Sequence, residues 1–143
     1  MGVVLAVCVS DKRGIQKKEV PEILCAKNIG ITTDAHAGDW HRQISLLADE
    51  SAEAMRQKGV EIGPGDFAEN ILTKGIAVKT LPIGSRISIG ESAVLEVTQI
   101  GKECHQHCAI YQAAGDCVMP REGIFAIVIK EGPIKAGDVI NVI

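Results

Sequence analysis

Short aliphatic segments separated by glycine-containing turns are the feature that most constrains the fold of this chain. Residues 60–90, VEIGPGDFAENILTKGIAVKTLPIGSRISIG, alternate between the two throughout. Aromatic residues make up only 3% of the sequence, so Val, Ile, Leu and Ala must build the core, and 15 glycines supply tight turns. β-branched residues favour strands, and many short strands joined by turns commonly close into a barrel. The sequence therefore predicts a mainly β fold, a barrel of short, largely antiparallel strands with one or two short helices.

Strands are expected where apolar runs have strand length. Residues 2–9, GVVLAVCV, form a continuous apolar run, and residues 91–100, ESAVLEVTQI, alternate between apolar and polar positions. Further strands are expected at 43–48, 123–132 and 136–143, with a turn at 132–138 and a loop at 34–42. One domain spanning residues 1–143 is the expected organisation, since no linker, repeat or low-complexity tract interrupts the chain.

The best helix signal is DESAEAMRQKG, residues 49–59. Acidic residues fill its first turn, basic residues its last, and Gly59 ends it. Asp49 or Ser51 is expected to cap its N-terminus, because short polar side chains accept hydrogen bonds from the first free N–H groups.

Charge and targeting signals narrow the functional class. A formal net charge of −3 and a pI near 5.8 give no electrostatic footprint for nucleic acid. The N-terminal apolar run lacks the basic region and cleavage site of a signal peptide, and no run is long enough to span a membrane. We therefore expect a cytoplasmic protein with reduced thiols. The odd count of five cysteines also argues against a complete disulfide framework.

A first cluster of candidate site residues lies in TTDAHAGDWHRQ, residues 32–43. His36 lies near Gly38, where the backbone can approach a ligand closely, and Arg42 precedes a buried strand and could bind a phosphate or carboxylate through its planar fork. The structural alternative is that Asp34 and Asp39 pair with Arg42 and fix a turn.

A second cluster lies in GPGDFAENI, residues 63–71, where two glycines and a proline force a sharp turn. Asn70 is the candidate binding residue here. The favoured alternative is structural, because buried Asn side chains often satisfy the backbone of loops.

The third cluster is QIGKECHQHCAIYQAAGDCVMPREGIF, residues 99–125, which contains Cys104, Cys108 and Cys117. Two cysteines three residues apart lie within zinc-ligand spacing, but a second clean pair is missing. A reactive thiolate instead needs nearby positive charge, which this segment offers at Lys102, His105, His107 and Arg121. Both the zinc site and the reactive thiolate remain open from the residues alone.

The remaining cysteines have a simpler interpretation. Cys8 and Cys25 lie in apolar runs and are expected to be core residues.

Several motifs, in this order along the chain, resemble the MOSC domain family, named after the C-terminal domain of molybdenum cofactor sulfurase. They are DAHAGDWHRQISLL, GDFAENI, LPIGSRISIGESAVLEVTQIGKEC, REGIFAIVI and GPIKAGDVI. The similarity runs from about residue 3 to residue 143, and the short chain is similar to the compact stand-alone bacterial members. The resemblance implies a barrel-like fold and a role around the molybdenum cofactor.

The resemblance also assigns a role to Cys104, the cysteine that follows the strand expected at residues 91–100. In sulfurase relatives this cysteine is thought to accept sulfur as a persulfide, and in amidoxime-reducing relatives it is the thiolate ligand of molybdenum. The chain departs from the family in having Glu103 where proline is common, and a nearby carboxylate opposes thiolate formation. The pyridoxal phosphate domain of the sulfurases and the extra domains of the reductases are not found, so pyridoxal phosphate is not expected on this chain.

The leading hypothesis is a molybdenum (or tungsten) cofactor-binding or sulfur-carrier protein that acts through Cys104, with Cys108 and Cys117 as resolving thiols. The pterin dithiolene would supply further sulfur ligands to the metal. The cofactor-binding residues would be His36, Arg42, Asn70, Lys102 and Arg121. Expected partners are cofactor-biosynthesis or sulfur-donor proteins and acceptor molybdoenzymes.

Two other functional classes stay open. One is a small structural zinc module that uses Cys104, Cys108, Cys117 and a histidine. The other is a molybdenum-dependent reductase of N-oxygenated or sulfoxide-like substrates that needs an external electron donor.

Overall fold

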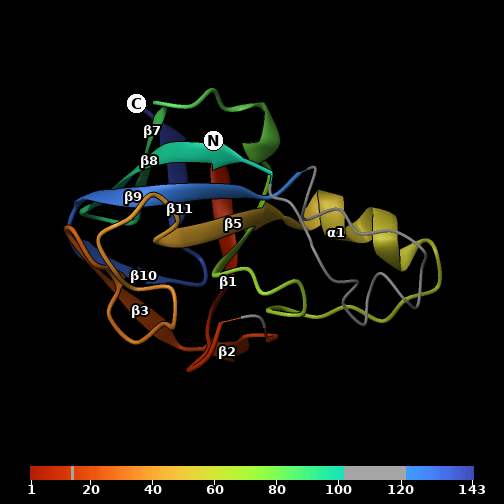
Figure 1. Cartoon of the computed structure of the whole chain (residues 1–143). Coiled ribbons are helices and arrows are strands. Elements are labelled where there is room, and N and C mark those ends of the chain that lie inside the picture. Colours follow the sequence, from red (N-terminus) through yellow and green to blue (C-terminus); the bar gives the residue numbers. More distant parts are fainter. Residues whose placement is uncertain (14, 102–121) are drawn as a thin grey trace.

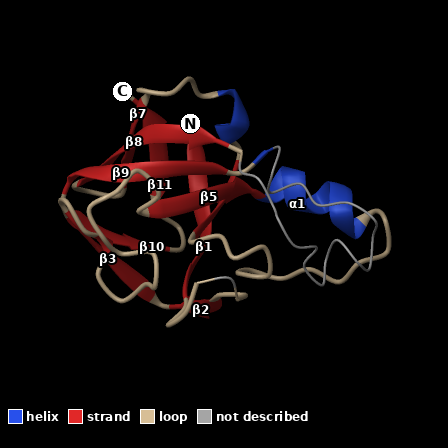
Figure 2. Ribbon diagram, viewed as in Figure 1, coloured by secondary structure: helices blue, strands red, loops and turns tan. Residues whose placement is uncertain are grey.

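The computed structural model describes residues 1–13, 15–101 and 122–143 of the chain (Figures 1 and 2). Strands dominate, with one α-helix and one short 3-10 helix between them in these residues. The strands are β1 (Gly2–Val9), β2 (Lys18–Val20), β3 (Glu22–Ala26), β4 (Gly30–Ile31), β5 (Ile44–Ala48), β6 (Ile71–Lys74), β7 (Arg86–Ile89), β8 (Ala93–Ile100), β9 (Ile124–Lys130), β10 (Gly132–Lys135) and β11 (Val139–Val142), and the helices are α1 (Asp49–Arg56) and η1 (Val78–Thr80). No helix in the described ranges is long and apolar enough to cross a membrane.

Seven of the strands close into a barrel. Their order is β11-β7-β8-β9-β5-β6-β1, and a further pairing of β1 with β11 joins the two ends. Every neighbouring pair is antiparallel except β5 and β6, and β2 extends the sheet beside the end of β1. This architecture confirms the predicted mainly β fold and its barrel.

A second, three-stranded sheet with the order β10-β3-β4 lies against one end of the barrel in the view of Figure 1. It corrects one prediction, because residues 132–138 were expected to form only a turn. Gly132–Lys135 instead form β10, since Ile134 is fully buried opposite Ile23 of β3. The turn between the last two strands is confined to the residues before Val139.

The barrel interior is aliphatic, as the scarcity of aromatic residues predicts. Side chains from every barrel strand meet there in one cluster of buried residues. The alternation predicted for β8 is observed, because Ala93, Leu95 and Val97 are buried while the residues between them are partly exposed. Since β-strand side chains alternate between faces, the intervening residues of β8 lie on the outside of the barrel.

Helix α1 follows β5 directly (Figure 2) and ends three residues earlier than expected. The predicted side-chain cap is wrong, because Ala48 occupies the capping position and makes no side-chain hydrogen bond there. Asp49 is already helical and accepts a hydrogen bond from Arg56 at 2.8 Å, while the Ser51 hydroxyl donates to Glu122 at 2.9 Å. The two candidate capping groups are therefore used elsewhere.

Candidate functional site

The predicted site residues divide into two groups. His36, Arg42 and Asn70 are described by the structure, while Cys104, Cys108, Cys117, Lys102 and Arg121 lie outside the described residues. The roles assigned to this second group, and to His105 and His107, stay predictions. The described part of the site is built from the ends of β1, β5 and β8 and from the loops that precede β5 and β6.

A buried polar cluster forms where β1 ends. The Lys17 ammonium donates to Asp34 Oδ1 at 2.8 Å and to the Ser10 hydroxyl at 3.0 Å, and lies 3.1 Å from His36 Nδ1. The side chains of Lys17 and Asp34 are both 0% exposed, whereas that of His36 is 22% exposed. His36 is therefore the member of this cluster that reaches solvent.

Asp34 is the anion of the cluster and is held ionised. Burial opposes its ionisation, but contacts with His36 and Lys17 and the backbone N–H groups of Ser10 and His36 outweigh this effect and lower the pKa of Asp34. This pairing also corrects the alternative in which Asp34 binds Arg42, because Asp34 is already saturated by the Lys17 cluster. An ionised carboxylate is what makes a buried ammonium tolerable at this position.

The loop between α1 and β6 holds Lys17 in place. The Lys17 N–H donates to Gly65 O at 2.9 Å, and a Cβ atom at Gly65 would lie 2.0 Å from the Lys17 carbonyl oxygen. Gly65 also has a φ of +85°, so glycine is required there on both counts. The side chain of Glu69 closes the loop by accepting the N–H groups of Gly65 at 2.8 Å and Phe67 at 3.1 Å.

Glu69 is fully buried, with 0% exposure. Burial disfavours its charged form and raises the pKa of its carboxyl, although the two N–H donors act in the opposite direction. Its negative charge also contributes to the high pKa of Cys8, which burial in the first place raises to about 12. Cys8 therefore remains a thiol, and the prediction that Cys8 and Cys25 are buried core residues is confirmed.

Asn70 is 1% exposed and has a structural role in the described contacts. Its amide nitrogen donates to Cys8 O at 3.0 Å, and its amide oxygen accepts the Ser45 N–H at 3.0 Å and the Ser45 hydroxyl at 3.2 Å. It thereby links β1 to β5 beside the start of β6, as the structural alternative expected. Its contact with a cofactor stays a prediction.

Arg42 lies across the outer face of the barrel near the end of β8. Its Nε donates to Gln99 Oε1 at 3.1 Å, and its guanidinium carbon lies 5.1 Å from the centre of the Phe125 ring. Gln99 is itself fixed, because its amide nitrogen donates to Gly101 O at 2.8 Å. No hydrogen bond joins Nη1 or Nη2 of Arg42 to the part of the chain that the structure describes.

The other residues of loop 34–43 connect His36 to Arg42. The Trp40 indole N–H donates to His36 O at 2.8 Å, and the two rings are parallel with centroids 6.2 Å apart. The Arg13 guanidinium covers Trp40 at 4.6 Å from a ring centroid. His41 Nε2 lies 3.0 Å from Gln99 Oε1, and the Thr98 hydroxyl donates to His41 O. These contacts tie the loop to β8.

The three described candidates are linked indirectly, through other residues, and do not contact one another in the described interactions. Asn70 bonds Ser45, and Ser45 is paired across β5 and β9 with Phe125, over which Arg42 lies. His36 is linked to the same region through Lys17 and the loop that contains Gly65. We call Lys17, Asp34, His36, Arg42, Asn70 and Gln99 the candidate site.

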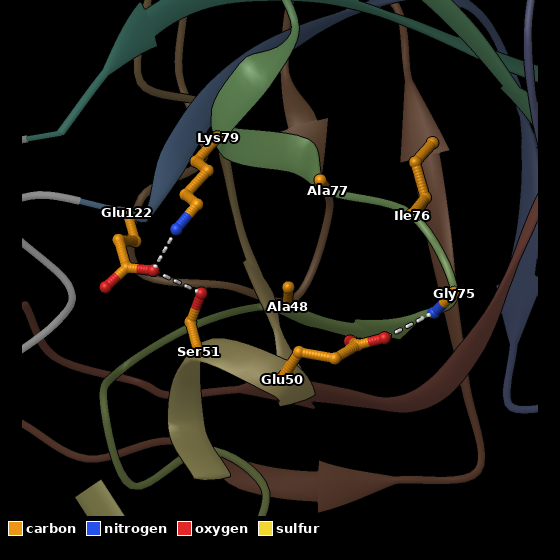
Figure 3. Close-up of a pocket in the computed structure, with 8 residues that line it drawn as sticks. All are labelled: Ala48, Glu50, Ser51, Gly75, Ile76, Ala77, Lys79 and Glu122. Atoms are coloured by element: carbon orange, nitrogen blue, oxygen red, sulfur yellow. Dashed lines mark hydrogen bonds and ion pairs between the residues drawn. The ribbon is translucent and has the colours of Figure 1, made fainter. Parts of the chain in front are cut away.

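A separate pocket of about 360 Å³ lies where β5 meets α1 (Figure 3). It is lined by Ala48, Glu50, Ser51, Gly75, Ile76, Ala77, Lys79 and Glu122, and it shares none of these residues with the candidate site. The Lys79 ammonium and the Ser51 hydroxyl both point to Glu122 Oε1, at 2.8 and 2.9 Å, while Glu50 accepts the Gly75 N–H. Its polar groups satisfy one another, so we assign it no ligand.

Sequence reasoning missed Lys17, Ser10 and Gln99. Lys17 belongs to the charged stretch QKKEV, in which nothing separates it from its exposed neighbour Lys18. The signal that could have found it is Asp34, because a carboxylate expected near a buried strand needs a positively charged partner. Gln99 is partly exposed next to the bulge between Val97 and Gln99 of β8, a feature that often re-aims a side chain.

The chemistry of this donor set fits an anionic, oxygen-rich ligand. Arg42 offers two nitrogen atoms and His36 one ring nitrogen, and both side chains are only partly buried. Within the described residues there is no group of three or more His, Cys, Asp or Glu side chains that could hold a metal ion. The three cysteines of the zinc alternative lie outside these residues, so that alternative stays a prediction.

Solved structures of other proteins share this fold. YuaD from Bacillus subtilis is similar with a TM-score of 0.82 and 22% identity, over 99% of this chain and 96% of that one. YiiM from Geobacillus stearothermophilus gives a TM-score of 0.71 at 16% identity, over 100% and 75% of the two chains. YiiM from Escherichia coli gives 0.69 at 17% identity, over 100% and 70%. At these identities the similarity shows the fold alone.

Sequence comparison identifies the family. No curated protein matches the chain significantly. The family model of the MOSC domain, however, matches residues 33–141, which include loop 34–43, the loop before β6 and every strand from β5 to β10. The chain therefore belongs to the MOSC domain family.

Proposed function

We propose that this protein binds the molybdenum (or tungsten) cofactor, or carries sulfur destined for it, through Cys104 in molybdenum cofactor metabolism. The MOSC family is linked to this cofactor and to sulfur metabolism, and the family match covers most of the chain. The observation that carries the proposal is the placement of Arg42. Its guanidinium is fixed beside Gln99 at the end of β8, and its outer nitrogen atoms face no partner in the described residues.

The chain itself relates Arg42 to Cys104. Gln99, the partner of Arg42, is five residues before Cys104, and Gly101, which accepts from Gln99, is three residues before it. Three residues span at most about 11 Å, so covalent connection alone keeps the two ends of this segment close. A cation at this edge would favour the ionised form of a nearby thiol and would bind the phosphate of a pterin ligand.

The proposed roles follow from this arrangement. Arg42 binds the terminal phosphate together with Lys102 and Arg121, His36 contributes a hydrogen bond, and Asn70 fixes the loop behind the site. The cofactor, when bound, supplies the metal and its dithiolene sulfur ligands, and the Cys104 thiolate supplies the protein ligand.

In the sulfur-carrier form of the proposal, Cys104 holds the outer sulfur as a persulfide. Cys108 or Cys117 then attacks the inner sulfur, which releases the outer sulfur as sulfide to an acceptor and leaves a disulfide. An external thiol reduces this disulfide and restores the free cysteines.

Replacing Cys104 with Ser tests the proposal. The protein is purified from cells that make the molybdenum cofactor, and its pterin, molybdenum and tungsten contents and its persulfide load are measured by mass spectrometry and metal analysis. We expect the Cys104→Ser variant to lose the persulfide or the metal, and Arg42→Gln to lose pterin while keeping the fold. Cys25→Ser is the matched control, since Cys25 is a buried core thiol whose pKa burial raises to about 12. Equal pterin, metal and persulfide contents in Cys104→Ser and wild type contradict the proposal.

A further inference from the structure

The Lys17 ammonium has a complete set of three partners. It contacts Ser10 Oγ at 3.0 Å, Asp34 Oδ1 at 2.8 Å and His36 Nδ1 at 3.1 Å, and its side chain is 0% exposed. An ammonium group has three N–H donors and no acceptor. In each of the three contacts Lys17 can therefore act only as the donor.

This geometry decides which nitrogen of His36 carries the proton. Because Lys17 donates to Nδ1, that nitrogen must offer its lone pair, and a neutral imidazole then carries its single proton on Nε2. Asp34 Oδ2 also lies 3.4 Å from Nδ1, but the Lys17 ammonium, at 3.1 Å, is the nearer partner of this nitrogen. Oδ2 already accepts the backbone N–H of His36 at 3.0 Å, and Oδ1 accepts Lys17 and the N–H of Ser10.

The rest of the surroundings hold the ring and leave Nε2 available. Trp40 lies parallel to the His36 ring and donates its indole N–H to the His36 carbonyl oxygen. The His36 side chain is 22% exposed, and within the described residues Nε2 has no hydrogen-bond partner. The ring is thus fixed on its Nδ1 side and presents its Nε2–H on the other.

We propose that Lys17 is a positioning residue that holds His36 in the Nε2–H tautomer, so that His36 donates a hydrogen bond to an oxygen acceptor of the ligand and does not coordinate a metal. A histidine that binds a metal through Nε2 needs its lone pair there and normally donates Nδ1–H to a carboxylate or carbonyl. The ammonium at Nδ1 forbids that arrangement. The proposed tautomer of His36 depends only on the contacts of Lys17, Asp34 and His36. The identity of the oxygen acceptor, a phosphate or carbonyl group of the ligand, rests on the proposed function.

The tautomer is measured directly by long-range proton–nitrogen NMR on full-length protein labelled with [15N]histidine, at a pH where His36 is neutral. The His36→Gln variant assigns the signals. In wild type we expect His36 to be almost entirely in the Nε2–H form. In Lys17→Met we expect the tautomer to reverse, because Nδ1 is then free to protonate and donate to Asp34 Oδ2. Nδ1–H in the wild type, or an unchanged Nε2–H form in Lys17→Met, overturns the proposal.

Two further variants keep the test decisive. Asp34→Asn retains the Lys17 donor, so His36 should keep the Nε2–H form in this variant. A change to the Nδ1–H form would show that Asp34, and not Lys17, determines the tautomer, and would contradict the proposal. If Lys17→Met does not fold, the double variant Lys17→Met, Asp34→Asn removes both charges together. We expect a clear rise of the Nδ1–H fraction in it, and no rise also overturns the role of Lys17.

The ligand class is tested on the same labelled protein with two probes. Titration with inorganic phosphate should shift the His36 Nε2–H signal in a saturable way, and titration with zinc chloride should leave His36 unchanged. The reverse pattern shows that His36 is a metal ligand and sinks the second half of the proposal. Since no cofactor is present in these measurements, their outcome is independent of the Cys104→Ser experiment.

Discussion

Lys17 and Arg42 both place a positive charge beside loop 34–43, but the fold surrounds the two charges differently. Lys17 is completely buried, and all three of its N–H donors are bound within the protein. Arg42 is partly exposed, and only its Nε is bound within the described residues. A saturated buried cation fixes the shape of its neighbours, whereas a guanidinium held by one edge keeps the other edge for a ligand. We therefore expect Lys17 to contribute mainly to the free energy of unfolding and Arg42 mainly to ligand binding.

The largest expected effect is the loss of stability in Lys17→Met. Removing one partner of a buried ion pair leaves an uncompensated charge on Asp34, which should lower the free energy of unfolding by about 3 to 5 kcal/mol. Urea unfolding followed by circular dichroism measures the change. Lys79→Met is the matched control, because Lys79 binds Glu122 at the same distance of 2.8 Å but is 50% exposed. An exposed pair contributes only about 0 to 1 kcal/mol. Equal losses in the two variants contradict the distinction between buried and exposed pairs.

The next effect is the acid sensitivity of the buried pair. The pKa of Asp34 is lowered in the folded state, so the stabilisation it provides is complete above its unfolded value near 4 and is lost as the pH falls below that value. We expect the wild type to lose on the order of 2 kcal/mol of unfolding free energy from this group as the pH is lowered from about 5. Chemical denaturation at a series of pH values measures the slope. The Asp34→Asn variant should be less stable at neutral pH, and its free energy of unfolding should fall less steeply as the pH is lowered. If the slope is the same as in the wild type, other carboxyl groups account for the acid sensitivity.

Of the two cations, only Arg42 could be identified from the sequence as a candidate site residue. Arg42 could be found because it follows a polar loop and precedes a buried strand. Lys17 could not, because burial of one lysine in QKKEV depends on Asp34, 17 residues away, and on the approach of Gly65, 48 residues away. Local patterns carry no information on such distant contacts, so the sequence located the cluster through His36 but missed the residue that fixes it.

The fold shows the same limit. The barrel, β1 and the alternation of β8 follow from hydrophobic periodicity, which is a local property. Strand β10 was predicted to be a turn because it contains Gly132 and Pro133, residues that favour turns. It is a strand because pairing with β3 buries Ile134, a tertiary effect that overrides local preference. The cap of α1 failed for the same reason, since Asp49 has a better partner in Arg56.

A smaller effect is expected in the loop that holds Lys17. Ala68 has a φ of +63°, a left-handed conformation that costs an alanine roughly 1 kcal/mol or more and glycine almost nothing. After the greater flexibility of glycine in the unfolded chain is counted, Ala68→Gly should stabilise the protein by about 0.5 kcal/mol. The thermal midpoint measures the gain. Asn28→Gly is the control, because Asn28 has a φ of +67° but asparagine tolerates this region, so little change is expected. A loss of stability in Ala68→Gly shows that the Ala68 methyl group makes contacts worth more than the strain.

A similarly small effect on stability, and the sharpest contrast with Lys17, is expected for Arg42→Gln. The variant loses one partly exposed hydrogen bond to Gln99 and the contact with Phe125, which together contribute less than about 1 kcal/mol at a solvent-accessible site.

The effect of Arg42→Gln on anion binding should be large, because the variant loses the free edge of the guanidinium. Inorganic phosphate should raise the thermal midpoint of the wild type by binding only the folded state, and this increase should disappear in Arg42→Gln. Arg86→Gln is the matched control, because Arg86 is also bound through Nε, to Glu96 at 3.1 Å, but lies on β7 and makes no hydrogen bond or ion pair with a residue of the candidate site in the described part of the chain. Phosphate stabilisation that persists in Arg42→Gln, or that disappears equally in Arg86→Gln, means that Arg42 is not the anion-binding cation and that its open edge has no role in binding.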